Sequence, residues 1–137
     1  LPDTTDILLN FTIDNVGNQT AIEPLFLLFK AVDYKQVLDE RHHEILGHYT
    51  LKALRPLKAS DSEKIEPLTV VISQEEYTAN VANFVVEVMY KTIHGDLIAD
   101  ASEIIVRLLL RPNIDVISRF TTKRYVNEKV YQKIIAG

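Results

Sequence analysis

The residues best suited to chemistry are the histidines gathered before the middle of the chain. Arg41-His42-His43-Glu44 is followed by His48, and His and Glu are common ligands of transition metals. The helical zinc-protease motif needs two histidines four residues apart, whereas His43 and His48 lie five apart and leave the shared helical face. On a strand, His42, Glu44 and His48 share a face, but about 7 Å for each two-residue step keeps them from one ion unless the strand bends. The spacing therefore favours outward-facing polar histidines over a His-centred metal enzyme.

The carboxylates offer a second metal chemistry, because calcium takes oxygen ligands that can come from several loops. The candidates are acidic residues in or beside predicted loops: Asp61, Glu75, Glu76, Asp96 and Asp100. Nothing in their spacing requires them to converge. We therefore predict no metal and no cofactor, and calcium stays the open alternative.

Other catalytic motifs are missing from the sequence. The chain has no cysteine, which excludes disulfides, thiolate catalysis and Cys-ligated zinc. It contains no nucleophile elbow and no phosphate-binding loop, and it has only four glycines. These absences predict that the protein is not an enzyme.

Two N-glycosylation sequons lie close together near the N-terminus. They are Asn10-Phe11-Thr12 and Asn18-Gln19-Thr20. We expect Asn10 on the outward face of a strand and Asn18 in a turn, the positions that glycan attachment requires. The sequence begins at Leu1 rather than Met, from which we expect N-terminal processing. Together with the two sequons, this favours an extracellular or cell-surface location.

Composition and charge restrict the partners. The chain of 137 residues is 47% apolar and 25% charged, which is typical of one globular domain spanning residues 1–137. The net charge is −4, and the only concentration of basic residues, within 119–133, is better explained as a solvated face than as a nucleic-acid footprint. No apolar run approaches the roughly 20 residues that a membrane-spanning helix needs.

The elements that must position these residues are mainly strands. Phe84, Val86, Val88 and Tyr90 alternate on one face of a run, and Ile104, Val106, Leu108 and Leu110 do so on a second. Between the runs, residues 93–96 supply a Gly beside an Asp, which is the chemistry of a hairpin turn. This stretch predicts a β-hairpin whose two faces, Val88 and Val106 included, form the core.

Further strand and turn signals complete the pattern. Residues 6–14 alternate as a half-buried strand, and residues 25–32 form an apolar run typical of a fully buried strand. Residues 33–43 read equally as a short helix or a polar loop. The remaining expected elements are strands at 45–53, 68–72 and 114–120, a loop at 74–82 and a terminal helix at 125–135. We therefore predict an all-β fold, an Ig-like or jelly-roll β-sandwich of about seven strands with one or two short helices.

Two segments resemble known extracellular proteins. In residues 8–21 a strand ends in Asn15-Val16-Gly17-Asn18 and Thr20-Ala21 leads onward, which resembles the opening of Ig-like modules related to cell adhesion in bacterial and archaeal surface proteins. Residues 58–65 resemble a polar loop of those modules, without its usual glycine. Residues 75–110 are similar to the end of archaeal extracellular tubule (cannula) subunits. The resemblance implies an extracellular structural role and, in the tubule case, assembly by strand exchange with bound calcium.

Together these features favour a non-enzymatic extracellular structural or adhesion module that assembles into a filament or surface layer. We expect a homo-oligomer formed by strand or edge pairing, with the apolar N-terminal residues Leu1, Pro2, Ile7 and Leu9 at the contact. The rival is an intracellular or viral module that binds another protein on a sheet edge or face. The His-centred metal enzyme is the third alternative.

Overall fold

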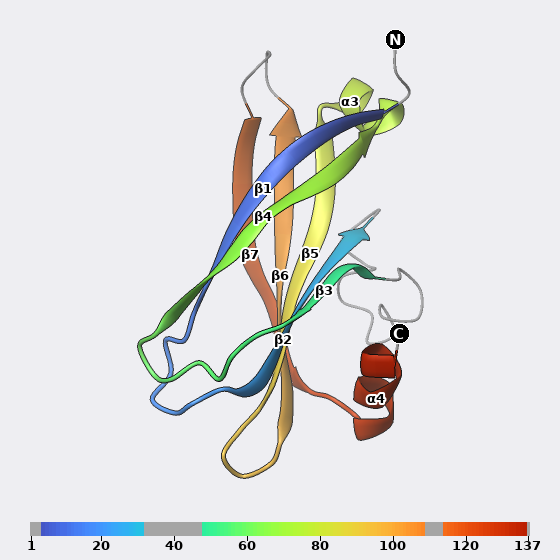
Figure 1. Cartoon of the computed structure of the whole chain (residues 1–137). Coiled ribbons are helices and arrows are strands. Elements are labelled where there is room, and N and C mark those ends of the chain that lie inside the picture. The colour runs from blue at the N-terminus through green and yellow to red at the C-terminus, as the bar shows by residue number, and fades with distance from the viewer. Residues whose placement is uncertain (1–3, 32–47, 109–113, 137) are drawn as a thin grey trace.

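Two antiparallel β-sheets face each other in the computed structural model, which describes residues 4–31, 48–108 and 114–136 (Figure 1). The smaller sheet has the order β1-β4 and the larger has the order β3-β2-β5-β6-β7. The described strands are β1 (Thr4–Asp14), β2 (Ile22–Ala31), β3 (His48–Ala53), β4 (Ser62–Ser73), β5 (Val81–Lys91), β6 (Leu97–Leu108) and β7 (Ile114–Tyr125). The described helices are α3 (Gln74–Ala79) and α4 (Glu128–Ala136). The predicted all-β sandwich of about seven strands is confirmed.

The predicted hairpin is the centre of the larger sheet. β5 and β6 pair without interruption from Val81↔Arg107 to Lys91↔Leu97. The turn is held by Thr92, whose hydroxyl accepts from the backbone N–H of Asp96 at 3.2 Å and whose own N–H donates to the Asp96 carbonyl at 2.9 Å. Gly95 takes a φ of 87° there, a left-handed conformation that glycine adopts without strain. The sequence therefore predicted both the turn and its position.

The main core lies between the sheets, because the β1–β4 ribbon crosses one face of the larger sheet diagonally (Figure 1). From the ribbon come inward side chains such as Leu9 and Val70, and from the larger sheet come Phe26, Phe84 and Val106. Phe11 also packs against this core, with its ring centroid 5.5 Å from that of Phe26. This layer contact is what holds a two-stranded ribbon in place, since such a ribbon is marginal by itself.

A second core lies on the opposite face of the larger sheet, under α4. Tyr131 and Ile134 of α4 pack there with Leu27, Phe29 and Met89. Because β2 contributes Phe26 and Leu28 to one core and Leu25, Leu27 and Phe29 to the other, its described apolar residues are buried on both faces. This confirms the predicted full burial for residues 25–29, whereas Lys30 is partly exposed.

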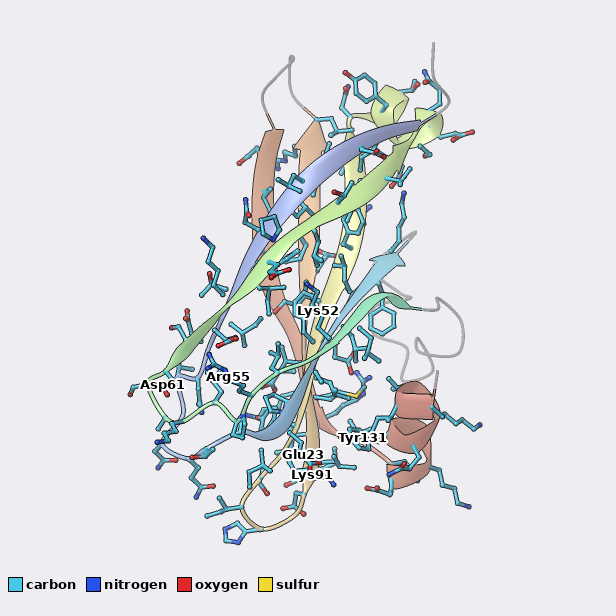
Figure 2. The ribbon with its side chains drawn as sticks, in the orientation of Figure 1. Glu23, Lys52, Arg55, Asp61, Lys91 and Tyr131 are labelled. Carbon is cyan, nitrogen blue, oxygen red and sulfur yellow. The ribbon has the colours of Figure 1, made fainter. Side chains whose placement is uncertain are left out.

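Lys91, at the end of β5, contacts Glu23 of β2 and Tyr131 of α4 (Figure 2). Its Nζ lies 3.4 Å from Oε2 of Glu23, and it sits 5.6 Å from the ring centroid of Tyr131 on α4. Hydrogen bonding to Glu23 raises the pKa of Lys91. The cation therefore helps to fix α4 against the sheet.

Several predicted boundaries change. The loop expected at 74–82 contains α3, which begins with a complete capping box: Ser73 accepts from the N–H of Glu76 at 3.2 Å, and Glu76 accepts from the N–H of Ser73 at 3.1 Å. β7 continues to Tyr125, so the terminal helix starts at Glu128 instead of residue 125. The helix-or-loop alternative at 33–43 lies outside the described residues.

The prediction that Val88 lies in the hydrophobic core is wrong. Val106 is fully buried in the main core, but Val88 is partly exposed and lines an opening between the sheets. The reason is the direction of the ribbon, which leaves the larger sheet toward the β5–β6 turn (Figure 1). The face predicted from alternation is therefore core at one end of the hairpin and pocket wall at the other.

Candidate functional site

The candidate site is a pocket of about 460 Å³ between the splayed ends of the two sheets. The end of β1 and the loop at residues 15–21 form one wall, and β5, β6 and Lys123 of β7 form the other. Its apolar surface comes from side chains such as Val86, Val88 and Ile98. A volume of this size is within the range of small-molecule sites in proteins, about 300–1,000 Å³.

The loop that closes the pocket is held by Asn15. The amide Nδ2 donates to the carbonyls of Gln19 at 2.8 Å and Leu57 at 2.9 Å, while Oδ1 accepts from the N–H of Gly17 at 3.0 Å. Beyond the loop, Ala21 and Leu57 exchange two backbone hydrogen bonds, at 2.9 and 3.0 Å. The rim therefore rests on side-chain and backbone contacts with a distant segment, which makes its shape pre-formed.

Asp100 supplies the main polar group of the pocket. Its Oδ2 accepts from the Tyr90 hydroxyl at 3.2 Å, and its Oδ1 is buried without a hydrogen-bond partner among the described residues. Burial raises the pKa of Asp100, and the charge of Lys123 and the Tyr90 hydrogen bond offset part of this rise. The pKa of Tyr90 is raised by burial and by Asp100, and that of Lys123 is raised chiefly by attraction to Asp100. These three residues form one electrostatic unit at the wall of the pocket.

Asp100→Asn is expected to stabilise the chain at neutral pH. The pKa of Asp100 is raised on folding. The contribution of Asp100 to folding stability is therefore fully present at a pH below its unfolded-state pKa near 3.8, and it is lost as the pH rises through its folded-state pKa. The gain should stay below about 1 kcal/mol, since the carboxylate is only half-buried and solvent screens it. Denaturant unfolding of both chains from pH 3 to pH 8 checks this.

The comparison should follow a specific pH pattern. The stability difference between the variant and the original chain should shrink toward zero in acid and grow toward neutral pH. Asp115→Asn, at an exposed carboxylate outside the pocket, is the control. A difference that does not change with pH would show that the ionised carboxylate of Asp100 carries no folding penalty.

The histidines that the sequence singled out do not form a described site. His42 and His43 lie outside the described residues, and His48 is described only as the first residue of β3. His94 is exposed in the β5–β6 turn. Within the described ranges no group of three His, Asp or Glu side chains could hold a metal ion.

The calcium candidates are separated by the fold. Glu75 and Glu76 lie on α3, at one end of the molecule, whereas Asp96 lies in the β5–β6 turn at the other end (Figure 1). Glu76 caps its own helix and pairs with Lys30, and Asp100 faces the pocket. The structure therefore does not bring these four carboxylates together.

The two sequons occupy the positions expected of them. Asn10 is exposed on β1, and Asn18 is exposed in the loop that closes the pocket. A glycan on Asn10 would project from the outer face of the ribbon, since side chains stand roughly perpendicular to a sheet. Both side chains are therefore accessible to modification.

The residues expected at a self-assembly contact need correction. Leu1 and Pro2 lie outside the described residues. Ile7 and Leu9 pair with Val70 and Leu68 of β4, and both face the main core, where Leu9 is 4% exposed. Their side chains stabilise this chain's own sandwich and are not offered to a second copy.

The backbone edge of β1 away from β4 has no neighbouring strand among the described residues. β1, which runs over eleven residues from Thr4 to Asp14, pairs with β4 alone among the described strands, and Asn10 is skipped in the register. Leu8 on its outward face is 56% exposed. A strand edge of this kind presents unpaired N–H and C=O groups to solvent.

Most of the site was not identified from the sequence. The alternation of β5 predicts Tyr90 in the core face, and the sequence indicates Asp100 only as a calcium candidate and Asn15 only as part of a turn. One signal was present: Asp100 and Ser102 interrupt the apolar alternation of Ile98 and Ile104 on the inward face of β6. Two polar residues on the inward face of a strand indicate that this part of the face is not packed in the hydrophobic core.

Fold and site together define an all-β sandwich with a pocket between its layers and an open strand edge. Comparison with protein-family models, curated proteins and solved structures found no match. In the described part of the chain, no helix is long and apolar enough to cross a membrane.

Proposed function

We propose that this chain is a non-enzymatic structural or adhesion module of the cell surface, which associates with copies of itself by pairing along β1. The observation that carries the proposal is the long edge of this strand, which faces no other described strand and contains no lysine or proline. Natural sheets usually protect their edges with short strands, lysines, prolines or bulges, because an open edge is a template for another strand. β1 is eleven residues long and contains no lysine or proline, and its pairing with β4 has one irregularity, between Leu9 and Phe11.

The other described edges differ from β1. β3 has only six residues and carries Lys52, while β4 carries Lys64, and Pro67 sits beside a bulge in its pairing with β1. β7 contains Lys123 and a bulge opposite Ala101 and Ser102. The sequence TTDILLNFTID of β1 contains no lysine, arginine or proline. Among these four edges, β1 is therefore the best suited to strand addition.

The division of the strands supports the same proposal. Among the described strands, a two-stranded layer faces a five-stranded one, whereas the immunoglobulin sandwich divides its strands almost evenly. A strand added beside β1 would widen the smaller layer. Backbone hydrogen bonds along the edge would supply affinity, and exposed side chains such as Leu8 would contact the incoming strand.

The cell-surface part of the proposal is supported by the exposure of Asn10 and Asn18. It predicts glycan mass on protein isolated from its native source. Unmodified native protein would instead favour the rival location inside the cell.

Leu8→Lys is expected to reduce self-association strongly while leaving the fold intact. The residue is exposed, so the substitution should change the free energy of unfolding by no more than about 0.5 kcal/mol. A lysine beside the edge would place a charge against the incoming strand, the device by which natural edges resist pairing. Sedimentation velocity over a concentration series measures the effect.

Val116→Lys is the matched control, because Val116 is an apolar residue of the edge strand β7 and is 46% exposed. It should associate like the original chain. Loss of association in this control but not in Leu8→Lys would contradict the assignment of the contact to β1. If self-association is absent but a different protein pairs at β1, the rival protein-binding function replaces the proposal.

A further inference from the structure

The pocket between the sheets has features that the proposed pairing along β1 does not use. Association at an edge needs backbone groups of one strand, but the pocket lies between the layers and carries Asp100, Tyr90 and a fixed rim. The role of the pocket therefore has to be explained independently of the proposed pairing along β1.

We propose that this pocket binds a small, non-anionic organic ligand whose apolar body rests on Val86, Val88 and Ile98 and whose O–H or N–H group donates to Oδ1 of Asp100. The three apolar side chains come from β5 and β6, on the face of the larger sheet that the ribbon leaves. They supply the surface that recognises an apolar body, and the carboxylate supplies the single point of polar recognition.

Oδ1 of Asp100 determines the chemistry of the ligand. A buried acceptor without a partner is costly, so native structures nearly always satisfy such atoms. An ionised carboxylate oxygen only accepts hydrogen bonds, so the ligand must supply a donor. Oδ2 already accepts from Tyr90 at 3.2 Å, which holds the carboxylate in place and leaves Oδ1 as the oxygen without a hydrogen bond among the described residues.

The charges around the pocket exclude anions. Asp14 and Asp100 both line it, and Lys123 is the single basic side chain among its described lining residues. A ligand carboxylate would meet the Asp100 carboxylate at close range, and like charges there are repulsive. Hydroxyl and amine ligands fit the site, whereas acids do not.

The rim makes the site pre-organised. Asn15 fixes the closing loop through hydrogen bonds to Gln19, Leu57 and Gly17, so little ordering remains to be done when a ligand enters. Ligands that enter a pre-formed site avoid part of the entropic cost of binding. Asn18, on the same loop, lies at the lining, so a glycan there would sit beside the mouth of the pocket.

The test compares three probes that share one apolar body: naphthylmethanol, its methyl ether and naphthoate. The alcohol can donate to Oδ1, the ether cannot, and naphthoate carries a negative charge. Titration of the full chain, followed by backbone amide chemical shifts at Tyr90, Asp100 and Asn18, should show saturable binding of the alcohol. Its affinity should exceed that of the ether by about tenfold, the effect of one hydrogen bond to a charged group, and naphthoate should not bind.

Asp100→Ala should bring the alcohol down to the affinity of the ether. Asp115→Ala, at an exposed carboxylate of β7 outside the lining, should leave the preference for the alcohol unchanged. Equal binding of alcohol and ether to the original chain, or no binding of either, would mean that water alone satisfies Oδ1, and this would overturn the proposal. Binding of naphthoate at the same amides would overturn it as well.

Discussion

Val106→Asp is expected to prevent folding. The side chain of Val106 is fully buried between the two sheets, beside Phe84 and Ala82 in the main core. An aspartate there would bury an unpaired charge, and the cost of several kcal/mol is comparable to the whole stability of a domain of this size. Circular dichroism and the dispersion of amide proton shifts should both report an unfolded chain.

Val88→Asp is the matched comparison, because it makes the same change on the same face of the neighbouring strand. Val88 is partly exposed at the pocket, so the new carboxylate would reach solvent and the chain should still fold, with a loss of stability of about 1–2 kcal/mol. If both variants unfold, the pocket end of the hairpin is as dry as the core. If Val106→Asp folds and has the same unfolding transition as the original chain, the placement of the core is wrong.

Arg124→Ala is expected to lower the free energy of unfolding by about 3 kcal/mol, the cost typical of breaking a buried ion pair by removing one partner. Nη2 of Arg124 lies 3.2 Å from Oε1 of Glu87, whose side chain is fully buried. The arginine of β7 reaches the glutamate of β5 across Ala99 and Ala101 of β6, whose small side chains leave the necessary room. Urea denaturation measures the loss.

Two controls separate burial from charge. Arg55→Ala breaks the pair with Glu63 at 3.3 Å, but Arg55 is 84% exposed, so the loss should stay below about 1 kcal/mol. The double variant Glu87→Leu/Arg124→Leu should be more stable than Arg124→Ala, since an apolar pair removes the buried charge as well. Equal losses for Arg124→Ala and Arg55→Ala would contradict the burial of the Glu87 pair.

Local patterns predicted the parts of the fold that depend on local rules. The turn at 93–96 and the alternation around it located β5 and β6, because side-chain period and turn chemistry are properties of a short segment. The apolar run at residues 25–32 predicts a strand buried on both faces, and β2 is buried in this way from Leu25 to Phe29. The capping box of Ser73 and Glu76 is also a local signal, and it marks the start of α3 within the segment predicted as a loop.

The arrangement of the layers could not be predicted in this way. Which strands pair depends on contacts between residues far apart in the sequence, such as Leu9 with Leu68 and Phe26 with Val88. The two-against-five division and the diagonal ribbon follow from those contacts, and they decide that Val88 faces a pocket while Val106 faces the core.

The same reason explains the missed site. Asp100 becomes a pocket residue only because the ribbon leaves the sheet at that end, and Asn15 fixes the rim through Leu57, which is 42 residues away. The side chains of Ile7 and Leu9 show the same limit. Their apolar character suggests a contact with another copy, but in the fold they face the larger sheet and pack in the main core.

The central claim is that copies of this chain associate along the open edge of β1, and the native mass of the purified chain tests it most directly. Sedimentation equilibrium at increasing concentration should give a mass that rises above the 15.6 kDa of one chain. Leu8→Lys should shift that rise to higher concentration. A single species of 15.6 kDa at every concentration would contradict self-association and with it the proposed structural role.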